Sequence, residues 1–222
     1  MSLTIYGIAA SRAVRPLWAA TELGLRFEHI PVNYQTGATR TPGFLAINPN
    51  GHIPVVVDHR ASDNGDDGGD VVVWESMAGA LYIARHHGQP DGLSITPASP
   101  REDADALRWS FWTVSECESD ALTVLMHRMV MPPERRKPEL VEAAERRLAV
   151  PLRVIEQHLV AQRARGQVHL AAARFTVADL CVASVLNWVR PARSLMDAHP
   201  LTRDWVSRCI ERSAHQTVKA AG

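Results

Sequence analysis

The residue types that could do chemistry begin with a serine near the start of the chain. In the segment IYGIAASRAVRP (5–16), Gly7 ends a strand-like run and Ser11 stands where a helix is expected to begin. Its hydroxyl could cap the helix, attack a substrate as a nucleophile, or donate to a substrate's own reactive group. The flanking glycines of a nucleophile elbow are absent, and the turn has no cysteine for disulfide chemistry. Ten histidines could supply a base, but no spacing places one beside Ser11.

A second segment, HIPVVV (52–57), could offer backbone groups to a ligand. Pro54 begins a β-branched run there and follows Ile53. If the Ile53–Pro54 peptide bond is cis, the N–H and C=O of Ile53 turn outward and can pair with an extended peptide. The alternative is a trans proline that simply starts the strand.

A third segment, WES (74–76), lies between an expected strand and an expected helix. Ser76 is a natural N-cap, and the free N–H groups of a helix start attract a carboxylate. Glu75 could bind an ammonium group, so the pair matches the zwitterionic head of an amino acid. Plain capping by Ser76 and a solvated Glu75 are the alternatives.

The apolar spacing predicts the elements that position these groups. Strands are expected at 2–6, 26–33, 54–58 and 71–75, a short helix or turn within 41–53, and helices at 12–23, 76–87, 101–131, 138–164, 176–190 and 201–213. A βαβ unit followed by a ββα unit gives an α/β domain with a four-stranded mixed sheet. Residues 88–100, rich in Pro and Gly, are typical of a linker, so the predicted domains are 1–87 and an all-helical 101–222.

Composition excludes several classes of protein. With 46% apolar residues in 222, the chain is expected to be globular, and 24 basic against 24 acidic residues argue against a nucleic-acid partner. Three distant cysteines predict neither a disulfide framework nor a zinc site. No secretory signal or apolar run long enough to span a membrane is seen, so a cytoplasmic protein is expected. The Gly- and Asp-rich segment 59–70 could suggest calcium, but its spacing favours a solvated hairpin loop, and no metal is expected.

At four places the chain resembles the glutathione transferase family. The resembling residues are Ser11, NPNGHIPVVVD (48–58), WESMAGALYIA (74–84) and FTVADL (175–180), in the family's order along nearly the whole chain. The resemblance implies a thioredoxin-like N-terminal domain, an all-helical C-terminal domain and a homodimer. It also implies glutathione as co-substrate, without a metal.

The resemblance further assigns roles within a glutathione site. The residues expected to bind glutathione are His52, Ile53, Pro54, Glu75, Ser76, Thr39 and Arg40. The backbone of Ile53, turned outward by a cis Pro54, would hold the cysteinyl part, and Glu75 and Ser76 would hold the γ-glutamyl head. His52 would reach the glycyl carboxylate or the peptide, and Thr39 and Arg40 are further candidates for the glycyl end. Thr39 and Arg40 could equally be ordinary loop residues.

Ser11 is then expected to be the catalytic residue, as a donor to the thiolate of bound glutathione. An ordinary thiol has a pKa of about 8.5. A hydrogen bond to a charged group contributes about 1.5–3 kcal/mol, which would lower that pKa by roughly one to two units. A serine followed four residues later by an arginine, here Arg15, recurs in serine-type relatives. The paired serines and cysteine of the zeta-type isomerases are absent, which places glutathione-dependent isomerisation in doubt, and a non-catalytic binding protein is the other alternative.

Two further predictions involve residues of the second half of the chain. A small hydrophobic electrophile would bind between the domains, against Ile8, Ala9, Trp112, Ser115 and Glu116. Tryptophans at helical spacing, such as Trp109 and Trp112, are also typical of an ordinary core. Thr176 and Asp179 have the form of a capping box, which predicts a structural role for both.

Overall fold

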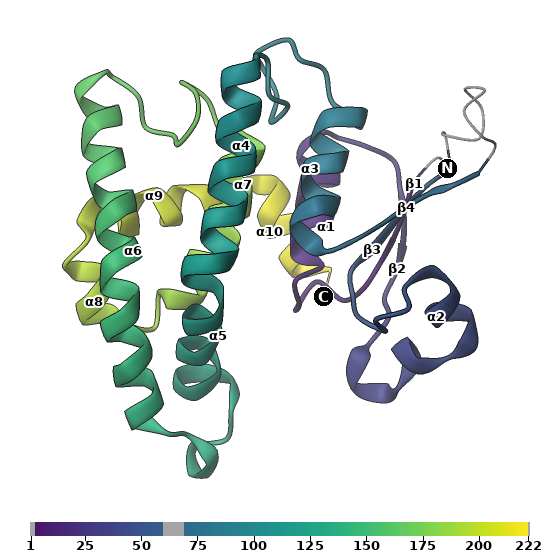
Figure 1. Cartoon of the computed structure of the whole chain (residues 1–222), viewed down its shortest axis with the longest axis horizontal. Coiled ribbons are helices and arrows are strands. Elements are labelled where there is room, and N and C mark those ends of the chain that lie inside the picture. Colours follow the sequence, from purple (N-terminus) through teal and green to yellow (C-terminus); the bar gives the residue numbers. More distant parts are fainter. Residues whose placement is uncertain (1–2, 60–68, 222) are drawn as a thin grey trace. The chain divides into compact units, whose positions relative to one another are not determined.

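The computed structural model describes residues 3–59 and 69–221. The chain divides into two compact units (Figure 1): unit 1 comprises Met1–Thr96 and Ser213–Gly222, and unit 2 comprises Pro97–Arg212. The division after Thr96 falls within the predicted linker 88–100. The last ten residues, however, were expected in the helical domain 101–222 and group instead with unit 1. Most of the Gly- and Asp-rich segment, residues 60–68, lies outside the described residues.

Unit 1 contains the predicted four-stranded mixed sheet. Its strands are β1 (Leu3–Tyr6), β2 (Glu28–Ile30), β3 (Val55–Asp58) and β4 (Val71–Trp74), in the order β2-β1-β3-β4. β1 runs parallel to β2 and antiparallel to β3, and β3 runs antiparallel to β4. The β-branched run in β3 forms a central strand that is buried along its whole length, as its composition favours.

Alternating residues of β3 face the two sides of the sheet. Val55 and Val57 pack with Phe44 of the short helix α2 (Pro42–Ile47). Val56 points the other way, towards Gly79 of α3 (Ser76–His87). The helices α1 (Val14–Glu22) and α3 lie together on that side of the sheet, and α2 lies apart from them (Figure 1).

A short C-terminal helix completes unit 1. α10 (Ser213–Ala220) packs against α1, with the rings of Trp18 and His215 4.6 Å apart between their centroids. The sequence predicted one helix at 201–213, whereas the chain forms α9 (Pro200–Ile210) and then α10. Only His215 and Val218 of α10 are buried, so its apolar pattern was too sparse to predict a separate helix.

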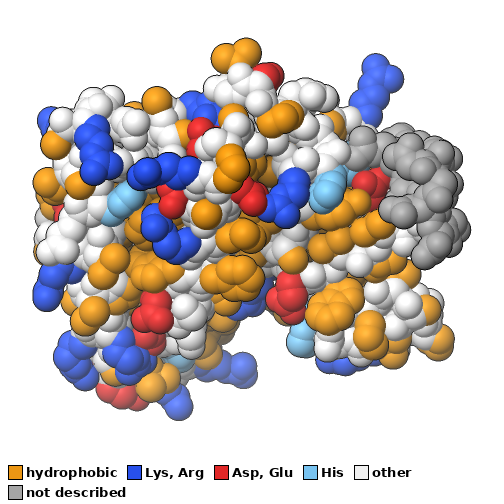
Figure 2. Space-filling view, turned by 45° about the horizontal axis from the view of Figure 1, so that its top comes forward, with side chains coloured by type: hydrophobic (Ala, Val, Ile, Leu, Met, Phe, Trp, Pro, Cys, Tyr) orange, Lys and Arg blue, Asp and Glu red, His pale blue; other side chains and the backbone are white. Residues whose placement is uncertain are grey.

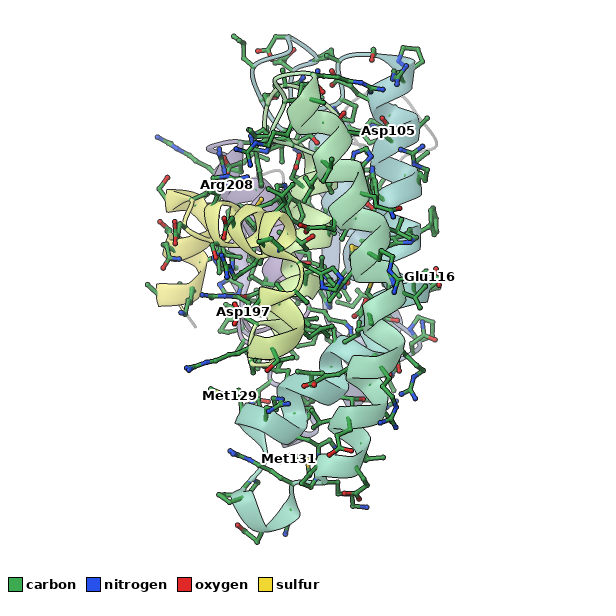
Figure 3. All side chains as sticks on the ribbon, turned by 90° about the vertical axis from the view of Figure 1, so that its left-hand side faces the viewer. Asp105, Glu116, Met129, Met131, Asp197 and Arg208 are labelled. Atoms are coloured by element: carbon green, nitrogen blue, oxygen red, sulfur yellow. The ribbon has the colours of Figure 1, made fainter. Side chains whose placement is uncertain are left out.

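Unit 2 is helical throughout its regular structure. Its helices are α4 (Pro100–Thr113), α5 (Ser119–Leu125), α6 (Pro138–Ala164), α7 (Val177–Leu186), α8 (Arg193–Asp197) and α9, with short 3₁₀ segments η6 (Pro133–Arg135) and η7 (Asn187–Val189). The predicted helix 101–131 is nearly continuous but contains two π-helical segments, η4 (Val114–Glu118) and η5 (Met126–Val130). Asp105 lies near its start and Met129 and Met131 near its end, at opposite ends of the unit in Figure 3.

The buried helix α7 begins at the predicted box. The backbone N–H of Thr176 donates to the carboxylate of Asp179 (2.9 Å), and the Thr176 hydroxyl donates to the same carboxylate (3.0 Å). The Asp179 carboxylate also accepts from the Leu170 N–H (2.9 Å) and the Trp205 indole N–H (3.1 Å). The box therefore ties the start of α7 to a loop and to α9.

The molecular surface mixes charged and apolar side chains, as Figure 2 shows for one face. In the part of the chain that the structure describes, none of the helices combines the length and the apolar character that a transmembrane span requires. Within residues 3–59 and 69–221, no group of three or more His, Cys, Asp and Glu side chains could hold a metal ion.

Candidate functional site

The strand register of unit 1 brings three predicted site segments to one edge of the sheet. Tyr6 pairs with Val55, and Val55 pairs with Trp74, so the three residues form one row across adjacent strands. The chain passes from this row into Gly7, Pro54 and Glu75, respectively. Because neighbouring strands are about 4.8 Å apart, these segments lie next to one another despite separations of 47 and 21 residues in sequence (54 − 7 and 75 − 54).

Gly7 allows the first two segments to approach closely. It has a φ of +134°, and a Cβ atom there would lie 2.7 Å from the Cβ of Ala13 and 3.2 Å from that of Ile53. A side chain at this position would clash with Ala13 and crowd Ile53. The turn of residues 8–13 therefore packs beside the residue that precedes Pro54.

The Ser11 hydroxyl is half-buried and bonds within its own turn. Its Oγ donates to the Ile8 carbonyl (2.7 Å) and accepts from the Ala13 N–H (3.1 Å). The N-cap position of α1 belongs to Ala13, so Ser11 is not the helix cap that its position suggested. The hydroxyl instead stabilises the turn that leads into the helix.

The Ile53–Pro54 peptide bond is cis, the first of the two alternatives left open by the sequence. Pro54 is buried and Ile53 is half-buried. Among the residues that the structure describes, none forms a hydrogen bond with the backbone N–H or C=O of Ile53. His52 is exposed, and its carbonyl accepts a hydrogen bond from the Asn48 side chain (2.8 Å).

Glu75 and Ser76 form the junction between β4 and α3. Glu75 occupies the N-cap position with φ +73° and ψ 116°, and its side chain is exposed. A non-glycine residue held at positive φ costs about 1–3 kcal/mol, and such residues gather at ligand sites. The expectation that Ser76 is the N-cap is wrong, because Ser76 is already the first helical residue.

The side chain of Ser76 has a different partner. Its Oγ accepts a hydrogen bond of 2.7 Å from Nη1 of Arg15, and both residues are buried. The sequence indicated Arg15 only by its distance from Ser11. Its contact with Ser76 joins α1 to α3 across 61 residues, and no local sequence pattern predicts such a contact.

Thr39 and Arg40 lie in η2 (Ala38–Arg40), which follows η1 (Tyr34–Thr36). The exposed Arg40 guanidinium donates to the Asn50 carbonyl (3.3 Å) and lies against Gly51, whose φ is +61°. Arg40 therefore lies beside the loop that carries His52. Thr39 is 3% exposed, so little of it can reach a ligand.

The residues predicted to line an electrophile pocket belong to both units. Ile8 and Ala9 lie in unit 1, and Trp112, Ser115 and Glu116 in unit 2. Ser115 and Glu116 are exposed in the π-helical segment η4, and Figure 3 labels Glu116 on the outer side of its helix. Trp109 is buried in the core and contacts Trp112 edge to face, with 5.1 Å between the ring centroids. Trp112 is half-buried. The pocket itself stays a prediction.

The fold and the motifs are similar to those of the glutathione S-transferase family. Residues 1–85 match the model of the glutathione S-transferase N-terminal domain, and residues 118–213 match that of the C-terminal domain. Glutathione S-transferase 3 from Zea mays is 32% identical, over 99% of this chain and 94% of its own. The chain belongs to the glutathione S-transferase family.

Other relatives agree with that assignment. Glutathione S-transferase GstB from Escherichia coli K12 is 25% identical over 97% of each chain. Among solved structures, a glutathione S-transferase-I bound with the ligand lactoylglutathione superimposes with a TM-score of 0.80, at 25% identity over 100% of both chains. The thioredoxin-like first unit and the helical second unit are thus those of a known transferase fold.

Proposed function

We propose that this protein is a glutathione transferase that ionises the thiol of bound glutathione for attack on a small hydrophobic electrophile. The observation that carries the proposal is the single row of Tyr6, Val55 and Trp74, because it gathers the Ser11 turn, the cis Ile53–Pro54 bond and the Glu75–Ser76 junction at one sheet edge. The family to which the chain belongs supports the same reading. A cytoplasmic location and a homodimer are part of the proposal.

The peptide would lie along this edge of the sheet. The γ-glutamyl carboxylate would accept hydrogen bonds at the start of α3, and the exposed Glu75 would attract its ammonium group. The backbone of Ile53 would pair with the cysteinyl residue as an added strand does. His52 and Arg40 would lie towards the glycyl end, with Thr39 behind them.

Ser11 would act on the sulfur by exchanging one hydrogen bond for another. Its proton now goes to the Ile8 carbonyl, which also accepts from the Ser11 N–H (3.1 Å) and so keeps a partner when the hydroxyl rotates. Giving up a neutral hydrogen bond costs about 0.5–1.5 kcal/mol, and a bond to a thiolate contributes about 1.5–3 kcal/mol. The difference lowers the thiol pKa by about one unit, the lower end of the range expected from the sequence.

The test is an ultraviolet titration of glutathione bound to the wild type and to Ser11→Ala. The wild type should bind glutathione and lower its thiol pKa, and Ser11→Ala should bind it with the pKa about one unit higher. Ser94→Ala is the matched control, because Ser94 bonds a backbone carbonyl elsewhere in unit 1 (3.1 Å). Failure of the wild type to bind glutathione would refute the enzyme and the site together.

A second candidate function is a glutathione-binding protein without transferase activity. The bond from the Ser11 hydroxyl to the Ile8 carbonyl favours it, because this bond occupies the one proton that thiol activation requires. Glutathione bound at its ordinary thiol pKa would identify this second function. An unchanged pKa in Ser11→Ala would remove Ser11 from the catalytic role while leaving the family assignment intact.

A further inference from the structure

A buried arginine lies directly behind the start of α3. Arg15, the second residue of α1, is 1% exposed, and Ser76, the first residue of α3, is 4% exposed. Nη1 of Arg15 and Oγ of Ser76 are 2.7 Å apart. A permanently charged group is rarely buried to this extent, since leaving water is costly for an ion.

This contact fixes the direction in which the Ser76 hydroxyl can donate. A guanidinium has donors only, so Ser76 Oγ must be the acceptor in the bond with Arg15. A hydroxyl has one proton, which must then point elsewhere. In residues 3–59 and 69–221 no acceptor takes that proton, and the N–H groups of the first turn of α3 are beside it.

We propose that Arg15 is a positioning residue for an anionic group at the start of α3, the α-carboxylate of the γ-glutamyl residue of glutathione, acting through the Ser76 hydroxyl. This inference rests on the proposed function. Arg15 holds Ser76 as a donor towards the ligand, and its charge adds to the positive end of the α3 dipole. The guanidinium itself stays buried and does not touch the ligand.

The same contact links binding to the thiol site. Arg15 follows Ser11 by four residues, at the start of the helix into which the Ser11 turn leads. A ligand that is held through Ser76 is therefore positioned by the same short stretch of chain that carries the hydroxyl proposed to act on its sulfur. The two residues have separable effects, because one acts on the carboxylate and the other on the thiol.

The test compares two ligands by titration calorimetry: glutathione, and glutathione whose γ-glutamyl α-carboxylate is a primary amide. Arg15→Met should weaken the binding of glutathione roughly 10- to 100-fold, because the Ser76 hydroxyl is no longer held as a donor and its hydrogen bond to the ligand carboxylate is lost. The binding of the amide should weaken less than about threefold. Arg15→Lys keeps a donor and a charge and should recover part of the loss. Arg26→Met, at an exposed arginine of unit 1, should bind both ligands as the wild type does.

Equal losses for the two ligands in Arg15→Met would overturn the inference, because they would show that Arg15 only supports the fold. Should Arg15→Met fail to fold, Arg15→Lys decides: a loss selective for glutathione supports the inference, and equal changes for the two ligands overturn it. Failure of the proposed function is distinguishable, because then the wild type binds neither ligand. Ser11→Ala should shift the thiol pKa while keeping the preference for glutathione over the amide.

Discussion

A serine hydroxyl carries one proton, and the two serines of the candidate site direct it differently. The proton of Ser11 goes to the Ile8 carbonyl, within the same turn. That of Ser76 is turned away from Arg15 and has no acceptor in the part of the chain that the structure describes. Ser76 is thus ready to donate, whereas Ser11 must first rotate. Binding at Ser76 should depend little on a hydroxyl rotation that thiol activation requires.

A single residue of unit 2 should make stability depend on pH in alkaline solution. Burial raises the pKa of the Cys117 thiol to about 12. The folded protein therefore keeps this proton to a higher pH than the unfolded chain, and the free energy of unfolding should fall as pH rises from about 9 towards 12. Between about pH 8 and pH 10.5 the contribution is about 2 kcal/mol.

The measurement is urea unfolding of the wild type and Cys117→Ala at both pH values. Other groups also titrate in this range, so the difference between the two proteins isolates Cys117. The wild type should lose about 2 kcal/mol more than the variant. Parallel losses in both proteins would mean that Cys117 titrates alike in the folded and unfolded states.

At the scale of elements, the start of α7 depends on one carboxylate. Asp179 is fully buried and accepts from the Thr176 N–H, the Leu170 N–H and the Trp205 indole. Asp179→Ala leaves these donors without an acceptor in the core, and each unsatisfied group costs about 1–3 kcal/mol. We expect a loss of about 3–5 kcal/mol in the free energy of unfolding, measured with urea.

The matched control is Asp197→Ala, because Asp197 is an exposed aspartate of unit 2 that pairs with Arg203 (2.8 Å). Exposed pairs contribute about 0–1 kcal/mol, so this variant should unfold nearly as the wild type does. Glutathione bound to folded Asp179→Ala should have the same thiol pKa as glutathione bound to the wild type. An unchanged midpoint in Asp179→Ala would show that the box is dispensable.

Local patterns predicted the elements well where each element carries its own signals. The helices at 76–87 and 138–164 have the bounds that the sequence predicted, because a strand-to-helix junction or a Pro marks each start and Gly follows each end. The π-helical segments within 101–131 were missed, since a stretch of five residues is too short for apolar spacing to distinguish an i→i+5 turn from an α-helical turn.

In the candidate site too, local patterns indicated some features and missed those that depend on backbone conformation or tertiary packing. The sequence indicated Ser11, Ile53–Pro54 and Glu75 because each lies next to a recognisable strand, and their roles in a site stay a prediction. The N-cap position of Glu75 depends on a backbone conformation at positive φ, which glutamate rarely adopts and which no propensity predicts. The Arg15–Ser76 contact depends on tertiary packing of α1 against α3.

At the scale of the whole molecule, the order of the chain does not match the division into units. The chain leaves unit 1 after Thr96, forms unit 2, and returns to unit 1 at Ser213. The returning helix α10 supplies His215 and Val218 to the packing around α1, where Trp18 is fully buried. Unit 1 is thus completed by residues more than 100 positions away from its own strands and helices.

Removal of residues 213–222 should therefore destabilise unit 1. It uncovers the Trp18 ring and removes the two buried side chains of α10, at a cost of about 2–4 kcal/mol by the apolar area that is exposed. Urea unfolding followed by tryptophan fluorescence should show a lower midpoint. Removal of residues 219–222 alone is the control, because Lys219 and Ala220 are exposed. Equal midpoints for the long truncation and the full chain would mean that α10 adds nothing to the stability of unit 1.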